Sequence, residues 1–130
     1  MTLDFEFKAD SVGEMPVLLS HGAWQVDGWF VQILGGALIV RTPQGDAQGP
    51  SIAPGRWYAV RFMYDGMDLH LAVDGRWVDR PANPVRSVPA RRPLVIGQYD
   101  QKQSPYAFRG TIRNVRLYSD VLPWQTATRP

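Results

Sequence analysis

Apolar and polar residues alternate with a period of two along most of this chain. In LDFEFK (3–8), leucine and phenylalanine occupy one face and charged side chains occupy the other. This period is typical of a β-strand with one buried face. The same pattern, or a short apolar run of strand length, recurs in VLLSH (17–21), WFVQIL (29–34), ALIVR (37–41), WYAVRFMY (57–64), LHLAV (69–73), RWV (76–78), LVIG (94–97) and TIRNVRLY (111–118).

Turn-forming pairs separate these runs, among them Gly35-Gly36, Asp65-Gly66 and Asp74-Gly75. Such pairs favour the tight turns of β-hairpins. No segment shows the apolar spacing of an amphipathic helix. About ten short strands without a helix predict an all-β fold, a two-sheet antiparallel β-sandwich of the jelly-roll type. We expect residues 1–130 to form a single domain.

The last strand breaks its own period. Ile112 has even parity, whereas Val115 and Leu117 have odd parity. One extra residue at Arg113-Asn114 would bring the apolar side chains back to one face. The sequence therefore predicts a β-bulge at this point.

Composition narrows the range of functions. The net charge is only +2, and 12 of the 14 basic residues are arginines, so we do not expect nucleic acid as a partner. The absence of cysteine excludes disulfides and thiolate zinc sites. No apolar run is long enough to span a membrane. The proline-rich segment 80–93 is interpreted as a solvated crossover, with a recognition surface as the alternative.

Two stretches carry a family resemblance. GRWYAVRFMYDGMDLHLAVDGRWV (55–78) resembles the central hairpin of laminin-G/concanavalin A-like lectin domains, and LVIGQYDQKQSPYAFRGTIRNVRLYSDVL (94–122) resembles their C-terminal part. The resemblance implies a concanavalin A-like jelly roll and a non-catalytic module that binds glycans or proteins. Such modules are often appended to secreted bacterial enzymes. The opening stretch is also similar to the accessory β-domain of some bacterial arylsulfatases, so we expect a secreted, extracellular or periplasmic parent chain.

This chain departs from its relatives at one point. Many of them carry an acidic pair where this chain has Arg113 and Asn114. The family often binds calcium, which prefers six to eight oxygen ligands. The available aspartates are Asp27, Asp46, Asp100 and Asp120. Their spacing matches no recognisable calcium loop, so no cofactor is predicted. Calcium stays possible, without an assigned site.

The candidate catalytic residues favour a non-enzyme. Asp4 and Glu6 lie two residues apart, but hydrolysis of a glycoside needs a facing pair of carboxylates. We interpret them as the solvated face of an edge strand. His70 is a lone outward histidine, interpreted as a surface residue. The remaining polar residues match no nucleophile or phosphate-binding motif.

The candidate binding residues lie in two loops. In HGAWQVDG (21–28), Trp24 offers a flat apolar face ringed by His21, Gln25 and Asp27, which suits the stacking of a sugar ring. The second loop, GQYDQKQSPYAF (97–108), adds Tyr99, Asp100 and Tyr106. If both loops lie at one end of the sandwich, they form one shallow site for an oligo- or polysaccharide.

Two alternatives stay open. Trp24 can instead fold over the end of the sandwich as a hydrophobic plug. The domain can also lack a glycan site and pack as an accessory module on a catalytic domain of the same parent chain.

Overall fold

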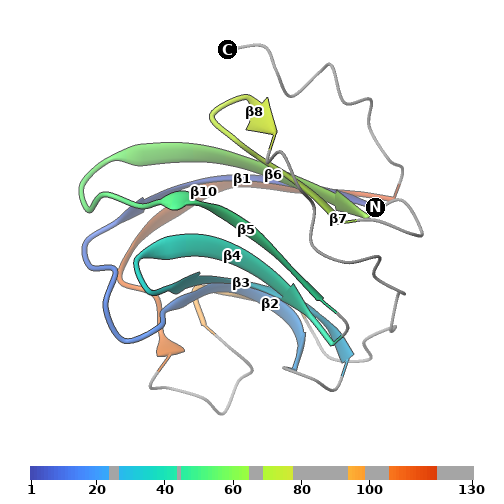
Figure 1. Ribbon diagram of the computed structural model, residues 1–130, viewed down its shortest axis with the longest axis horizontal. Helices are drawn as coiled ribbons and strands as arrows, with labels where there is room; N and C mark the ends of the chain where they lie inside the picture. The colour runs from blue at the N-terminus through green and yellow to red at the C-terminus, as the bar shows by residue number, and fades with distance from the viewer. Residues whose placement is uncertain (24–26, 44, 65–68, 78–93, 99–105, 120–130) are drawn as a thin grey trace.

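The structure, a computed structural model, describes residues 1–23, 27–43, 45–64, 69–77, 94–98 and 106–119. Within these residues the chain forms ten strands and no helix (Figure 1). The strands are β1 (Thr2–Ala9), β2 (Val17–Ala23), β3 (Asp27–Leu34), β4 (Ala37–Thr42), β5 (Gly45–Ser51), β6 (Trp57–Tyr64), β7 (Leu69–Val73), β8 (Arg76–Trp77), β9 (Val95–Ile96) and β10 (Gly110–Tyr118).

The ten strands form two five-stranded sheets that stack face to face. Sheet A has the order β10-β1-β6-β7-β8, and sheet B has the order β5-β4-β3-β2-β9. Every strand pairing within the two sheets is antiparallel. The predicted two-sheet antiparallel sandwich is confirmed. One strand was missed by the pattern: β5 (GDAQGPS) carries two glycines and a proline, and only its pairing with β4 identifies it.

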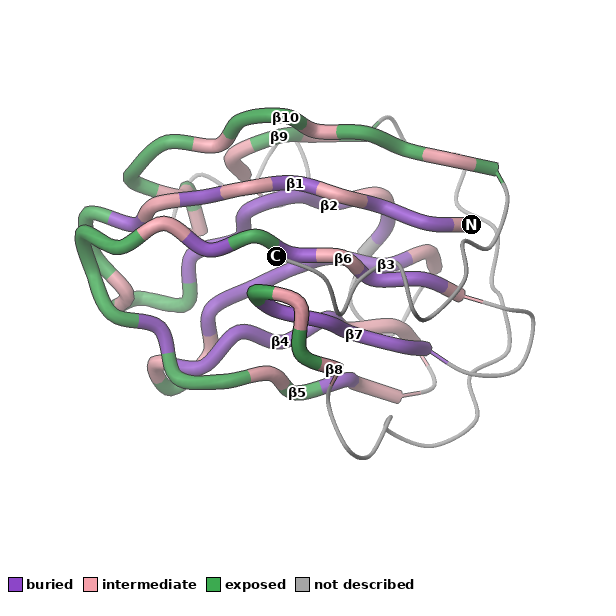
Figure 2. The backbone as a smooth tube through the Cα atoms, turned by 90° about the horizontal axis from the view of Figure 1, so that it is seen from above, coloured by how far each residue is buried: buried purple, intermediate pink, exposed green. Residues whose placement is uncertain are grey.

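The core lies between the two sheets and is strongly aromatic. The alternation in β1 places Leu3, Phe5 and Phe7 in this core, each at most 2 % exposed. The rings of Trp29 and Phe62, one from each sheet, meet edge to face with centroids 4.8 Å apart. Figure 2 shows this buried interior as the purple inner strands. Aromatic contacts of this kind add to the free energy gained by burying apolar area.

Two of the predicted turns have the geometry that their residues favour. Asp74 and Gly75 have φ angles of 53° and 78°, and Gly35 and Gly36 have φ angles of 61° and 82°. Two successive positive φ angles define the type I′ turn, whose twist matches that of a hairpin. The predicted Asp65-Gly66 turn lies outside the described residues.

The expected edge position of the first strand is wrong. β1 is central in sheet A, paired with β6 on one side and β10 on the other. The local alternation of a strand is the same in both positions, because the neighbours come from distant parts of the chain. The edges of sheet A are β10 and β8.

The predicted bulge in the last strand is confirmed. Asp4 pairs with Arg116 and Glu6 with Arg113, so three residue steps of β10 oppose two of β1. Asn114 in the bulge has a φ angle of 56°. As a result, Ile112 and Val115 both pack against the core. Leu117 pairs with buried Leu3, yet it remains 51 % exposed on the edge strand.

The backbone of the bulge sets a stability requirement at position 114. Asn114→Val is expected to destabilise the fold by about 1–2 kcal/mol more than Asn114→Gly, because a β-branched residue is strained at a positive φ angle. Both variants remove the side-chain amide, so their difference isolates the backbone. Urea unfolding monitored by tryptophan fluorescence measures it. Equal stabilities would contradict a left-handed conformation at this residue.

Candidate functional site

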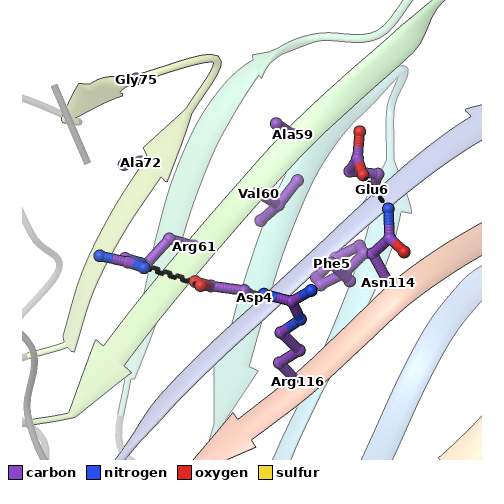
Figure 3. A pocket seen from close by; sticks show the side chains of 10 residues that line it. All are labelled: Asp4, Phe5, Glu6, Ala59, Val60, Arg61, Ala72, Gly75, Asn114 and Arg116. Carbon is purple, nitrogen blue, oxygen red and sulfur yellow. Dashed lines mark hydrogen bonds and ion pairs between the residues drawn. The ribbon is translucent and has the colours of Figure 1, made fainter. Parts of the chain in front are cut away.

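An open groove crosses the outer face of sheet A, the face turned away from the core. Its volume is about 290 Å³, at the lower end of the usual range of small-molecule sites. We call it the outer groove; its lining residues are Asp4, Phe5, Glu6, Ala59, Val60, Arg61, Ala72, Gly75, Asn114 and Arg116 (Figure 3).

The strand register explains how the outer groove forms. One row across the five strands of sheet A consists of Arg116, Asp4, Arg61, Ala72 and Trp77. In the next row Glu6 pairs with Ala59. Paired residues project from the same face of a sheet. Large charged side chains therefore stand beside Ala59, Ala72 and Gly75, whose small or absent side chains leave the floor low.

An ion pair stands on one side of the outer groove. The guanidinium of Arg61 donates to both carboxylate oxygens of Asp4, with an Nε–Oδ1 distance of 2.6 Å and an Nη2–Oδ2 distance of 2.7 Å. The hydrogen bond to Asp4 raises the pKa of Arg61 above its ordinary value. A bidentate pair of this kind fixes both side chains in one orientation.

A second polar cluster stands on the other side. Asn114 Nδ2 donates to Glu6 Oε1, and Arg113 Nη2 lies 3.4 Å from Glu6 Oε2. The hydrogen bond from Asn114 lowers the pKa of Glu6; desolvation opposes this effect, and the charges of Arg113 and Arg116 reinforce it. The Glu6 carboxylate therefore remains ionised at neutral pH. Figure 3 shows the two hydrogen-bonded pairs flanking the floor of the groove.

Trp57 orients the cationic side chains next to the groove. It lies two residues from Ala59 on the same face of β6 and is half-buried. The guanidinium carbon of Arg113 lies 3.6 Å from the centroid of its ring system, and Lys8 Nζ lies 5.3 Å from it. These cation–π contacts hold Arg113 beside Glu6. Trp57 serves here as a platform for the protein's own cations.

The chemistry of the outer groove favours hydrogen bonding over proton transfer. A glycosidase needs one carboxyl group whose pKa is raised, so that it can donate a proton to the leaving oxygen. Here the pKa of Glu6 is lowered, and Asp4 is held by Arg61. Ionised carboxylates, an amide and guanidiniums in fixed positions are suited to bind hydroxyl groups.

The described residues on either side of Trp24 end β2 and begin β3. Trp24 and Gln25 are outside the described residues. His21 pairs with Trp29, and its ring stands 5.8 Å from the Trp29 ring at an angle of 70°. Asp27 begins β3 and pairs with Ala23, the last residue of β2. His21 therefore covers an edge of the core where the loop leaves the sheet.

The described parts of the second predicted loop lie against β2. Ser20 Oγ, next to His21, donates to the carbonyl oxygen of Gln98 at a distance of 3.2 Å. Ala107, next to Tyr106, forms a parallel bridge with Val17 at the beginning of β2. The single shallow site expected from the two loops stays a prediction. The other two predicted residues of this loop, Tyr99 and Asp100, are outside the described residues.

The expectations for His70 and for a calcium site can also be compared with the structure. His70 is not a surface residue: it is only 9 % exposed, and its ring lies edge-on to Trp77 at 6.5 Å. Within the described ranges, no three His, Asp or Glu residues group in a way that could hold a metal ion. Asp46 contacts Arg41 at 3.5 Å. Asp100 and Asp120 are outside the described residues, so a calcium site stays unplaced.

No helix in the described part of the chain is long and apolar enough to cross a membrane.

The comparison with protein families is decisive for the class of protein. A laminin G family model, described as the concanavalin A-like lectin/glucanases superfamily, matches residues 1–127. The chain belongs to this family. The search of curated proteins finds no match to the chain.

Solved structures share the fold at low sequence identity. Domains LG4-5 of the mouse laminin α1 chain match with a TM-score of 0.70 and 24 % identity, over 88 % of this chain and 34 % of that chain. Domain 4 of AbnA, an extracellular arabinanase from Geobacillus stearothermophilus in complex with arabinotriose, matches with a TM-score of 0.66 and 16 % identity, over 98 % and 64 %. A mutant Trypanosoma rangeli sialidase with trans-sialidase activity matches with a TM-score of 0.66 and 21 % identity, over 98 % and 22 %. The chain thus spans about a third of the laminin chain and less of the sialidase.

The lowered pKa of Glu6 predicts a specific pH dependence. Because the folded pKa lies below the ordinary value of 4.5, the ionised carboxylate contributes stability above that pH and loses it as the pH falls through the folded pKa. Glu6→Gln should therefore be less stable than the wild type at neutral pH, and the difference should shrink on acidification. Urea unfolding at a series of pH values measures it. Glu14→Gln, in the exposed loop before β2, is the matched control; a wild-type–Glu6→Gln difference independent of pH would contradict the assignment.

Proposed function

We propose that this domain is a non-catalytic carbohydrate-binding module, and that the outer groove of sheet A binds the glycan. The observation that carries the proposal is the fixed set of polar groups above a floor of small side chains. Sugar hydroxyls both donate and accept hydrogen bonds, so they match a surface that offers carboxylate, amide and guanidinium groups together. Because these side chains hold one another in place, a ligand need not order them on binding.

The state of the two carboxylates supports binding without catalysis. Asp4 is engaged by Arg61, and Glu6 is engaged by Asn114. The lowered pKa of Glu6 is opposite to what general acid catalysis needs.

The comparisons support a module within a larger secreted protein. Two of the similar structures belong to carbohydrate-active proteins, the extracellular arabinanase and the sialidase mutant. In each of them the matched part is only a share of the whole chain. On this basis we expect the glycan or a neighbouring domain of the same parent chain as partner, outside the cytoplasm.

The loop of Trp24 remains a second proposed contact for the glycan. Trp24 and Gln25 would provide the stacking face and a hydrogen-bonding group, with His21 and Asp27 at the base of the loop. Tyr99, Asp100 and Tyr106 of the second loop would contribute to the same contact if both loops lie at one end of the sandwich.

The alternative function is that of an accessory domain without a glycan site. It is favoured by exposed apolar side chains on the strands at one margin of the sandwich. Ile96 in β9 is 54 % exposed and Leu117 in β10 is 51 % exposed. Both strands are at the edge of their sheets, on the same side of the molecule in Figure 2. A neighbouring domain packed along this margin would cover them.

Filling the floor of the outer groove tests the proposed function. Ala59→Leu should weaken glycan binding by about tenfold or more, because the larger side chain occupies the space of the ligand. The thermal midpoint should change little, since Ala59 is exposed. Ala53→Leu, at another exposed alanine outside the groove, is the matched control and should bind normally.

Affinity electrophoresis against a panel of neutral and acidic polysaccharides measures both variants. Retardation of the wild type that survives Ala59→Leu would remove the groove from the proposal. No retardation by any polymer would favour the accessory domain instead.

Replacing the loop tryptophan separates its two interpretations. Trp24→Ala should reduce binding with little change in the thermal midpoint if the side chain stacks on a sugar. A fall in the midpoint with binding intact would identify Trp24 as a plug over the end of the core. Differential scanning fluorimetry beside the electrophoresis distinguishes the two outcomes.

A further inference from the structure

The charges around the outer groove are not balanced. Two positive and two negative charges line the groove, with Arg61 and Arg116 beside Asp4 and Glu6. Arg113 and Lys8, which stand over Trp57 beside the groove, add two positive charges. The surroundings of the groove therefore carry a positive surplus, which favours an anionic group in the ligand.

Two of the three guanidiniums are already engaged. Arg61 forms the bidentate ion pair with Asp4. Arg113 lies over the ring of Trp57 and contacts Glu6. Each of these arginines has a fixed position and its own counter-charge.

Arg116 differs from both. Its side chain is exposed, lines the outer groove and reaches back across β1 toward Asp4 and Phe5 (Figure 3). No hydrogen bond or ion pair in the described parts of the chain engages its guanidinium. Its charge lowers the pKa of Glu6, and its guanidinium, with five N–H donors, can form hydrogen bonds to a ligand in the groove.

We propose that Arg116 binds an anionic substituent on a sugar ring, so that the outer groove selects acidic over neutral saccharides. This inference rests on the proposed function and names the ligand class of the same groove. The ring would lie over Ala59, between the Asp4–Arg61 pair and the Glu6–Asn114 pair. Its carboxylate or sulfate group would then face Arg116, which can donate two parallel hydrogen bonds to either.

The size of the groove supports a single recognition contact of this kind. A volume of about 290 Å³ accommodates a short segment of a glycan chain. The paired carboxylates of Asp4 and Glu6 would repel a second anionic group placed near them. The groove itself therefore takes one negatively charged group, at the position of Arg116.

The experiment compares one saccharide in charged and uncharged form. The probes are oligogalacturonate, the same oligomer after methyl esterification, and a sulfated galactan oligomer, each titrated into the whole 130-residue domain by calorimetry. The acidic oligomer should bind about tenfold or more tightly than its methyl ester, as expected for one charge-assisted hydrogen-bonded pair. Binding of the sulfated oligomer would show that the groove accepts either anion, and its failure would identify the carboxylate.

Two variants assign the effect to Arg116. Arg116→Gln should abolish the preference for the charged form, so that the acid and its methyl ester bind with similar affinity. Arg109→Gln removes the same charge at another exposed position, outside the outer groove, and should keep the preference. Circular dichroism checks that both variants fold.

Each remaining outcome overturns a definite statement. Equal binding of acid and ester, or an equal loss in both arginine variants, overturns selection by Arg116 and leaves the carbohydrate-binding function intact. If none of these oligomers binds but a neutral polysaccharide does, the inference fails and the proposed function holds. If no saccharide of any kind binds, both fail.

Discussion

The position of β1 between β6 and β10 is the constraint on which the rest of the structure depends. Its pairing partners lie about fifty to sixty residues away in β6 and more than one hundred residues away in β10, so the first strand is held by the middle and the end of the chain. Through this pairing, its apolar side chains enter the core. The same pairing aligns Asp4 and Glu6 with arginines from both neighbouring strands. The core and the outer groove therefore lie on opposite faces of the same hydrogen-bonded sheet.

The bulge in β10 connects stability with the candidate site. An extra residue at this point lets Ile112 and Val115 both reach the core. It also turns Asn114 toward Glu6, where a regular strand would present a different side chain. The left-handed backbone costs energy, and the hydrogen bond to Glu6 offsets part of that cost. Bulges often re-aim side chains next to functional sites, and this one shapes a wall of the outer groove.

Much of the fold could be predicted from local pattern. The alternation in LDFEFK, the Asp74-Gly75 turn and the parity change after Ile112 each reflect geometry within a few residues, and each is confirmed. The weak pattern of β5 was missed because glycines and a proline dilute it. The outer groove was missed because its residues come from separate strands. Its one available signal was the presence of alanines among the outward positions of β6 and β7.

The sequence by itself determined the class of the fold, since period-two patterning and turn residues act locally and leave few alternatives. It also indicated which side of β1 and of β6 is buried. Only the tertiary structure decided that β1 is central and that Asp4 meets Arg61. Those facts depend on which strands become neighbours. That choice is made by packing across the whole chain, and no short window of sequence contains it.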